Sequence, residues 1–244
     1  SAGLIAMNYF EHYQRVNDLS REGRQRHWQP FEKTLARFLP GNRDAVIVDV
    51  GCGAGILLEW LQSKGYRNAS GIDPDQGQIA FCKQLGVPAE QVSDSAGWLE
   101  NKSGIDLLIC KDILEHIPED QVRAILSAAR QSLKPGGQLY ISVPNALASL
   151  APFWLYNDGT HLRSYTERVL GLELARAGFD VVSVGDDDTW AVGGAAGLVR
   201  LALRTLFRFV RRLEVLGELG ADGLRVPLGL NLVMVATPAN TDEL

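Results

Sequence analysis

The chain has 244 residues, enough for one substantial hydrophobic core, and we expect a single domain. Apolar residues make up 46% and charged residues 22%, and the net charge of −5 excludes a nucleic-acid-binding protein that relies on an overall positive surface. No run of roughly 18 or more uncharged apolar residues predicts a membrane-spanning helix. The three cysteines, Cys52, Cys82 and Cys110, lack metal-site spacing and are typical of reduced core thiols, so we expect a cytoplasmic protein.

Hydrophobic periodicity predicts the elements in chain order. Residues 5–38 carry apolar side chains at roughly helical intervals, and Pro40-Gly41-Asn42 ends that pattern. Short apolar runs then alternate with helical patterns. Strands are expected at 45–50, 70–73, 91–93, 105–110, 138–143, 180–184 and 230–236. Helices are expected at 56–64, 76–85, 120–133 and 167–177.

This alternation predicts an α/β, Rossmann-like fold, with a mostly parallel seven-stranded sheet and helices on both faces. Within the single domain 1–244, a core at 45–185 follows an N-terminal helical cap at 1–40. A helical insertion at 186–229 precedes the final strand at 230–237. Because ligands bind outside the carboxyl ends of the strands in such sheets, we expect both extra segments to cover that edge as substrate caps.

The most informative stretch is 46–55, a strand followed by a glycine loop that opens a helix. A dinucleotide-binding loop would have a glycine where Ile56 stands. Asp49, two residues before Gly51, would disfavour a pyrophosphate but favour a cationic amino group. Asp73 follows Gly51 by 22 positions, the distance typical of a carboxylate that holds two ribose hydroxyls.

Five separated motifs between residues 45 and 183 resemble those of class I S-adenosylmethionine-dependent methyltransferases. The first two are Asp49-Val-Gly51-Cys52-Gly53-Ala-Gly55 and Gly71-Ile-Asp73. Ser93-Asp94-Ser95 resembles the acidic turn near the adenine, 106–118 the fourth-strand motif, and 133–137 the turn before the fifth strand. The resemblance implies S-adenosyl-L-methionine as cofactor and S-adenosyl-L-homocysteine as product. The implied cofactor-binding residues are Asp49, Gly51, Cys52, Gly53, Gly55, Asp73, Pro74, Asp94, Ser95, Lys111 and Asp112.

Two histidines are the candidate catalytic residues. The cofactor supplies the reactive methyl group, so the protein has to position the acceptor and, for a hydroxyl acceptor, remove its proton. His116 follows the fourth strand, and His161 lies in the polar loop 157–165. That loop resembles the corresponding loop in ubiquinone-biosynthesis O-methyltransferases and in methyltransferases of bacterial surface-glycan synthesis. Each histidine could instead orient or cap its loop.

A metal site is a less favoured alternative. Asp112, Glu115 and His116 resemble a cluster that binds a divalent ion in some ubiquinone-biosynthesis O-methyltransferases. Asp112 and Glu115 could equally cap the helix that begins near Pro118, and we expect no metal ion.

The stretch 197–213 carries Arg200, Arg204 and Arg208 as an i, i+4 stripe among apolar residues, with no acidic residue before Glu214. This pattern predicts a basic amphipathic helix that meets a membrane surface or an anionic, lipid-linked acceptor. The alternative is a cap or homodimer helix with arginines that extend along its surface.

The expected function is O-methylation of a hydroxyl on a glycan or other small hydroxylated metabolite by in-line methyl transfer. A phenolic quinone precursor is the alternative acceptor. A non-catalytic cofactor-binding partner protein would need no base, so the histidines count against it, and Ile56 counts against a dehydrogenase. N- or C-methylation stays open, because Val143-Pro144-Asn145-Ala146 differs from the Asn-Pro-Pro-Tyr motif of amino acceptors. We expect no nucleic-acid partner.

Overall fold

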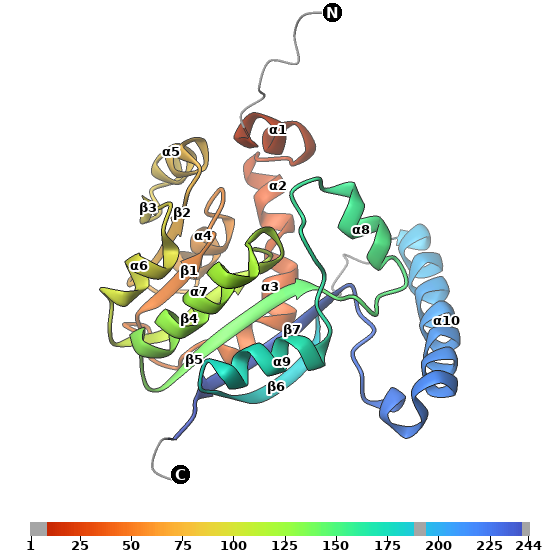
Figure 1. Ribbon diagram of the computed structural model, residues 1–244. Helices are drawn as coiled ribbons and strands as arrows, with labels where there is room; N and C mark the ends of the chain where they lie inside the picture. Colours follow the sequence, from red (N-terminus) through yellow and green to blue (C-terminus); the bar gives the residue numbers. More distant parts are fainter. Residues whose placement is uncertain (1–8, 188–193, 241–244) are drawn as a thin grey trace, which may run out of the picture.

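The computed structural model describes residues 9–187 and 194–240, which form one sheet flanked by helices (Figure 1). Within these residues seven strands pair in the order β3-β2-β1-β4-β5-β7-β6. Strands β1 to β5 run parallel, and β7 is antiparallel to both β5 and β6. The predicted mostly parallel seven-stranded sheet is therefore confirmed. The strands are β1 (Ile47–Val50), β2 (Ala69–Asp73), β3 (Ala89–Gln91), β4 (Ile105–Lys111), β5 (Leu133–Pro144), β6 (Phe179–Asp187) and β7 (Asn231–Pro238).

Helices cover both faces of the sheet, as expected, and bury one hydrophobic cluster on each. Leu99, Val122 and Leu170 pack on one face, and Phe31, Leu58 and Ile79 pack on the other. The helices of the sheet region are α4 (Ile56–Ser63), α5 (Gln76–Leu85), α6 (Ser95–Glu100), α7 (Glu119–Ser132), α8 (Ala151–Asn157) and α9 (Glu167–Arg176). The extra segments are α1 (Tyr9–Val16), α2 (Arg21–Arg26), α3 (Trp28–Thr34) and η1 (Ala36–Phe38) before the sheet, then α10 (Gly194–Leu219) and η3 (Gly220–Leu224) before β7, with η2 (Leu114–His116) following β4.

Besides the helices α6 and α8, which the sequence did not predict, four segments show the main differences from the expected boundaries. The N-terminal segment is divided into short helices, because Ser20 caps α2 by accepting a hydrogen bond from Gly23 N–H. Strand β3 begins two residues before the expected 91–93. Strand β5 begins at Leu133, which pairs with Ile105 across a register shift, inside the stretch expected to be a helix end and turn. Strand β6 continues to Asp187 because it pairs with β7 as far as Asn231, so the expected insertion starts later than 186.

The topology brings the carboxyl ends of all the parallel strands to one edge of the sheet. Strand order changes direction between β1 and β4, and in an open α/β sheet that point is where ligands bind. In register, Val50 pairs with Ile72 on one side and with Cys110 on the other, so the residues that follow these strands meet. Across the described part of the chain, no helix is long and apolar enough to cross a membrane.

Candidate active site

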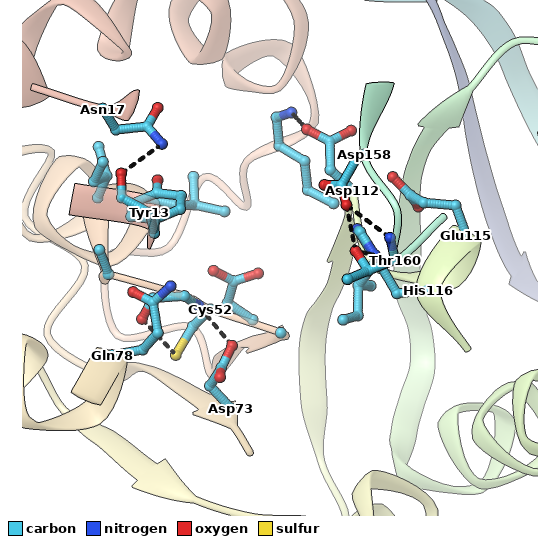
Figure 2. Close-up of a pocket in the computed structure, with 18 of the residues that line it drawn as sticks. Tyr13, Asn17, Cys52, Asp73, Gln78, Asp112, Glu115, His116, Asp158 and Thr160 are labelled. Atoms are coloured by element: carbon cyan, nitrogen blue, oxygen red, sulfur yellow. Dashed lines mark hydrogen bonds and ion pairs between the residues drawn. The ribbon is translucent and has the colours of Figure 1, made fainter. Parts of the chain in front are cut away.

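A cavity of about 970 Å³ lies at this edge. Its wall is formed by α1, α3, the glycine loop, the ends of β1, β2 and β4, the segment 154–161 and the start of β7. Figure 2 shows two groups of side chains, with Cys52, Asp73 and Gln78 in one and Asp112, Glu115, His116, Asp158 and Thr160 in the other. The expected site residues that line the cavity are Asp49, Gly51, Cys52, Gly53, Asp73, Pro74, Lys111, Asp112, His116 and His161.

Gly51 and Gly53 of the glycine loop differ in the space that a side chain would find there. Gly51 has a φ of 75°, and a Cβ there would lie 2.7 Å from Ile113, so a turn this tight admits only glycine. Gly53 also has a positive φ, of 51°, but a Cβ built on it meets nothing within 4 Å. The loop therefore leaves open space at Gly53, where a ligand can approach the backbone.

Asp73 fixes this loop from the end of β2. One carboxylate oxygen accepts a hydrogen bond from Gly53 N–H at 2.9 Å, and the other accepts one from Asp75 N–H at 2.9 Å. Burial raises the pKa of Asp73, although both N–H bonds act to lower it. Each oxygen keeps acceptor capacity, so the carboxylate can also receive two hydroxyl groups.

Asp49 is a buried carboxyl at the end of β1, with 3% of its surface exposed. Burial, followed by repulsion from Asp73, raises its pKa to about 8. Lys111, at the end of β4, forms ion pairs with Asp112 and, at 3.8 Å, with Asp187. These two carboxylates outweigh the effect of burial and raise the pKa of Lys111. No hydrogen bond or ion pair from the described residues reaches the carboxyl group of Asp49, which is therefore suited to a cationic ligand.

Asp112 has the backbone strain that is typical of functional sites. Its φ is 53°, which is uncommon outside glycine but tolerated by aspartate. Its N–H donates to Ser142 O at 2.8 Å, and its carboxylate accepts from Asn231 Nδ2 at 2.7 Å. These contacts tie Asp112 to β5 and β7 in the wall of the cavity.

His116, Thr160 and Asp158 form a hydrogen-bonded chain. Thr160 Oγ1 lies 2.8 Å from His116 Nδ1 and 2.6 Å from Asp158 Oδ1. Burial acts to raise the pKa of Asp158, but hydrogen bonds from the Thr160 hydroxyl and N–H lower it below its usual value. An ionised carboxylate only accepts, so the single hydroxyl hydrogen of Thr160 goes to Asp158. His116 must then donate from Nδ1, which leaves the lone pair of its Nε2 available as a base.

His161 is oriented by a different contact. Its Nδ1 lies 3.1 Å from Trp154 O, which can only accept, so Nδ1 carries a proton, and its Nε2 lies 3.8 Å from Asp158 Oδ2. The rings of His116 and His161 meet edge to face at 4.6 Å. Burial, followed by repulsion from His161, lowers the pKa of His116, which keeps it neutral near pH 7.

Glu115 completes a cluster with the two histidines. It is buried, and its Oε2 has no hydrogen-bond partner within the described residues. Burial, followed by repulsion from Asp112, raises its pKa to about 8. Glu115, His116 and His161 each offer one ligand atom, all within 4.8 Å of one another. Asp112 belongs to the Lys111 and Asn231 contacts instead, so the possible ligand set differs from the one that the sequence suggested.

Three expected cofactor residues lie outside the cavity wall. Gly55 begins α4 with a φ of 73°, and a Cβ there would lie 2.8 Å from Cys82 and Val87. Asp94 caps α6 by accepting a hydrogen bond from Gly97 N–H at 3.0 Å, and Ser95 is the first residue of that helix. A contact of Asp94 or Ser95 with the adenine remains a prediction.

Several residues in the cavity wall were not identified from the sequence. Tyr13, Asn17 and His27 reach it from the N-terminal helices, and burial raises the pKa of Tyr13. Gln78 is only 2% exposed, and its Oε1 has no partner within the described residues. A polar residue on the buried side of a helix was the available signal for Gln78. Thr160 lies in the polar loop that the sequence singled out, but its contact depends on tertiary structure.

Comparison with known proteins identifies the class. The sequence profile of the methyltransferase domain family matches residues 20–184, more than half of the chain. The chain therefore belongs to the methyltransferase domain family, as a class I S-adenosylmethionine-dependent methyltransferase. The expected cofactor is confirmed.

Three individual proteins illustrate how similar the chain is to known methyltransferases. A ubiquinone biosynthesis O-methyltransferase of Colwellia psychrerythraea is 34% identical over 136 residues, which are 50% of this chain and 54% of that protein. The chain thus spans about half the length of this relative. An S-adenosylmethionine-dependent methyltransferase structure from Archaeoglobus fulgidus matches with a TM-score of 0.65 and 19% identity, covering 93% of this chain and 99% of that one. Magnesium protoporphyrin IX methyltransferase from Synechocystis, solved with bound S-adenosylhomocysteine, matches with a TM-score of 0.62 and 16% identity over 96% of each chain. Both structural matches concern the fold.

Proposed function

We propose that this protein is an O-methyltransferase that transfers the methyl group of S-adenosylmethionine to a hydroxyl of a glycan or other small hydroxylated metabolite. The observation that carries the proposal is the chain from Asp158 through Thr160 to His116, which leaves a neutral imidazole nitrogen beside the cofactor cavity. A hydroxyl acceptor must lose its proton during methyl transfer, and an oriented imidazole is suited to take it. A non-catalytic cofactor-binding protein would not need such an arrangement.

The two groups of side chains in the cavity have different roles. Asp73 receives the ribose hydroxyls, and Asp49 attracts the positive charge of the cofactor. His116 Nε2 accepts the acceptor's proton, and Asp158, acting through Thr160, stabilises the imidazolium that results. His161 lies against the His116 ring and limits how it can turn. The transfer itself relies on the reactivity of the cofactor, so positioning accounts for most of what the protein contributes.

Asn145 supports oxygen rather than nitrogen as the accepting atom. Its amide N–H groups both donate, to Pro227 O and Gly229 O at 3.0 Å, and its carbonyl accepts from Leu147 N–H. The side chain is therefore used to hold the turn before β7, and it does not offer a carbonyl to an amino acceptor. The name of the Colwellia relative favours a phenolic quinone precursor as the second candidate acceptor.

A divalent ion is a second way to hold the acceptor's oxygen. The buried, unpartnered Oε2 of Glu115 and the close ligand atoms of His116 and His161 fit such an ion. Glu115, His116 and His161 would hold it, and when bound it would favour the ionised form of the acceptor hydroxyl. The His116 lone pair then serves as a ligand, so base and ligand are alternative roles of the same nitrogen.

Transfer of isotopically labelled methyl from S-adenosylmethionine to a panel of glycans, catechols and amines tests the proposal. We expect product with hydroxyl acceptors and none with amines. His116→Asn should lower kcat by about 10²–10⁴-fold with cofactor affinity unchanged, whereas His161→Asn should have a smaller effect. Methylation of amines alone, or full activity of His116→Asn, would exclude the assignment. Activity that a chelator abolishes and Mg²⁺ or Mn²⁺ restores would assign the cluster to an ion.

A further inference from the structure

Helix α10 stands at the periphery of the molecule (Figure 1). It has 26 residues, and Val215 is the only buried one, although every residue of the helix is described. Its packing partner is mainly η3, the short turn that follows it. A helix of this length normally buries a stripe against its own domain, and α10 does so only near its end.

The arginines of α10 turn toward the protein and not outward. At 100° per residue, Arg204 and Arg208 lie within about 20° of Val215 around the helix axis. Arg208 approaches Asp186 at 3.8 Å, and Arg212 donates to Gly223 O and Val226 O at 2.6 and 2.8 Å. The arginine stripe seen in the sequence therefore marks the inner side of the helix, and Arg200, which is exposed, lies at its edge.

The outer side of α10 is apolar along four turns. Leu206 lies opposite Val215, and the side chains around it are between 50% and 64% exposed. We define the outer face of α10 by these residues: Leu198, Val199, Leu203, Leu206, Phe207, Phe209, Val210 and Leu213. Within 198–213 the charged residues are arginines alone. A contiguous apolar surface of this kind marks a site of interaction.

We propose that the outer face of α10 docks onto an anionic lipid bilayer, with the helix axis along the membrane surface. The helix has five arginines and two glutamates, a local charge of +3 in a chain whose net charge is −5. Leucine, valine and phenylalanine on one side with arginine on the other is the pattern of helices that lie in the membrane interface. No described helix can span a bilayer, so α10 lies on the surface.

Charge favours a bilayer over a second copy of the chain. Pairing two α10 helices would bring two segments of charge +3 together, which electrostatic repulsion opposes. The apolar side also covers about half of the helix circumference, wider than the narrow seam of a two-helix coiled coil. Anionic headgroups, in contrast, attract the net positive charge of the helix, and Arg200, exposed at the edge of the outer face, adds about 1 kcal/mol. This proposal does not depend on the identity of the methyl acceptor.

Vesicle co-sedimentation tests the docking surface. Vesicles of phosphatidylcholine alone are compared with vesicles that contain equal parts of phosphatidylcholine and phosphatidylglycerol. We expect about fivefold stronger binding to the anionic vesicles, weakened by high salt. Leu206→Glu with Phe209→Glu should lower binding at least about tenfold, because both charges enter the buried face. Val169→Glu with Leu172→Glu, on α9 at 52% and 51% exposure, is the matched control and should bind like the wild type.

Two results would overturn the proposal. Equal binding of the wild type to neutral and anionic vesicles, or none to either, excludes docking on an anionic bilayer. Light scattering after size exclusion measures the mass in solution without lipid. A dimer that Leu206→Glu with Phe209→Glu converts to a folded monomer, together with no vesicle binding, would assign the outer face of α10 to a second copy of the chain.

Discussion

The hydroxyl of Thr160 joins Asp158 to His116, and Thr160→Val removes that hydroxyl while keeping the shape of the side chain. Two hydrogen bonds disappear, at 2.8 Å to His116 Nδ1 and at 2.6 Å to Asp158 Oδ1. The N–H of Thr160 still donates to Asp158, so the loop keeps one of its local contacts. What is lost is the link that stabilises the imidazolium of His116.

A hydrogen bond that involves a charged group contributes about 1.5–3 kcal/mol, so kcat should fall about 10- to 150-fold. Cofactor affinity should stay within about twofold, because Thr160 lies among the acceptor-side residues and Asp73 is unaffected. Burial already lowers the pKa of His116, and the contacts with Asp158 and Thr160 act to raise it. Loss of the Thr160 hydrogen bond, with Asp158 still in place, should lower that pKa further, which moves the acidic limb of the pH–rate profile to lower pH.

Single-turnover rates between pH 5 and pH 9, roughly the range of histidine titration, measure both effects. Thr205→Val on α10 removes a hydroxyl that donates to Leu201 O, and it is the matched control for the same chemical change. A fall in rate without movement of the acidic limb would assign Thr160 to loop structure alone. Unchanged rate and pH profile would remove the chain from the mechanism, and with it the assignment of His116 as the base.

Three further predictions follow from the cavity. Asp49 has a pKa of about 8, and a cationic cofactor favours its ionised form. S-adenosylmethionine affinity should therefore fall up to about tenfold per pH unit below pH 8, and calorimetry should detect release of a proton on binding. Asp49→Asn should remove both the pH dependence and the proton release. Gly53→Ala and Gly86→Ala place a side chain at positive φ in open space and should each lower stability by about 1–2 kcal/mol, but only Gly53→Ala should weaken cofactor binding in a titration. Burial also raises the pKa of Glu115 to about 8, so its contribution to stability is present below the pKa of the unfolded chain, near 4.5, and is lost as pH rises through 8. In thermal unfolding without ligand, Glu115→Gln should therefore reduce the decline of stability with pH. The same dependence of stability on pH in the variant and the wild type would contradict this.

The sheet and the cofactor side of the cavity could be predicted because their signals are local. A buried strand that contains Asp49, together with the glycine loop after it, occupies ten consecutive residues, and Asp73 ends the next strand. Glycine at positions of positive φ is required by backbone sterics alone, so it is visible without knowledge of the fold. Strand lengths were harder, since β5 and β6 extend along partners that lie far away in sequence.

The acceptor side could be predicted only as a set of residues. The sequence marked His116 and His161 as candidates, but the choice between them depends on Thr160 and Trp154, whose contacts form across the fold. The metal alternative shows the same limit. Its suggested ligand Asp112 instead forms an ion pair with Lys111 and a hydrogen bond with Asn231, whereas His161 reaches the cluster from another loop. Neither the choice between the two histidines nor the set of possible metal ligands can be derived from the spacing of residues in the sequence.

The orientation of α10 shows why a charge pattern does not by itself identify a contact surface. Arginines spaced four residues apart must share one side of a helix. Whether that side faces the protein or the solvent depends on the acceptor groups that the rest of the protein places beside the helix. Here Asp186 forms an ion pair with Arg208, and two backbone carbonyls accept hydrogen bonds from Arg212, so the cationic side turns inward and the apolar side outward. The arginines then have two roles. Arg208 and Arg212 hold the helix against the domain, and Arg200, at the edge of its outer face, adds to the positive charge that favours an anionic surface over a second positively charged helix.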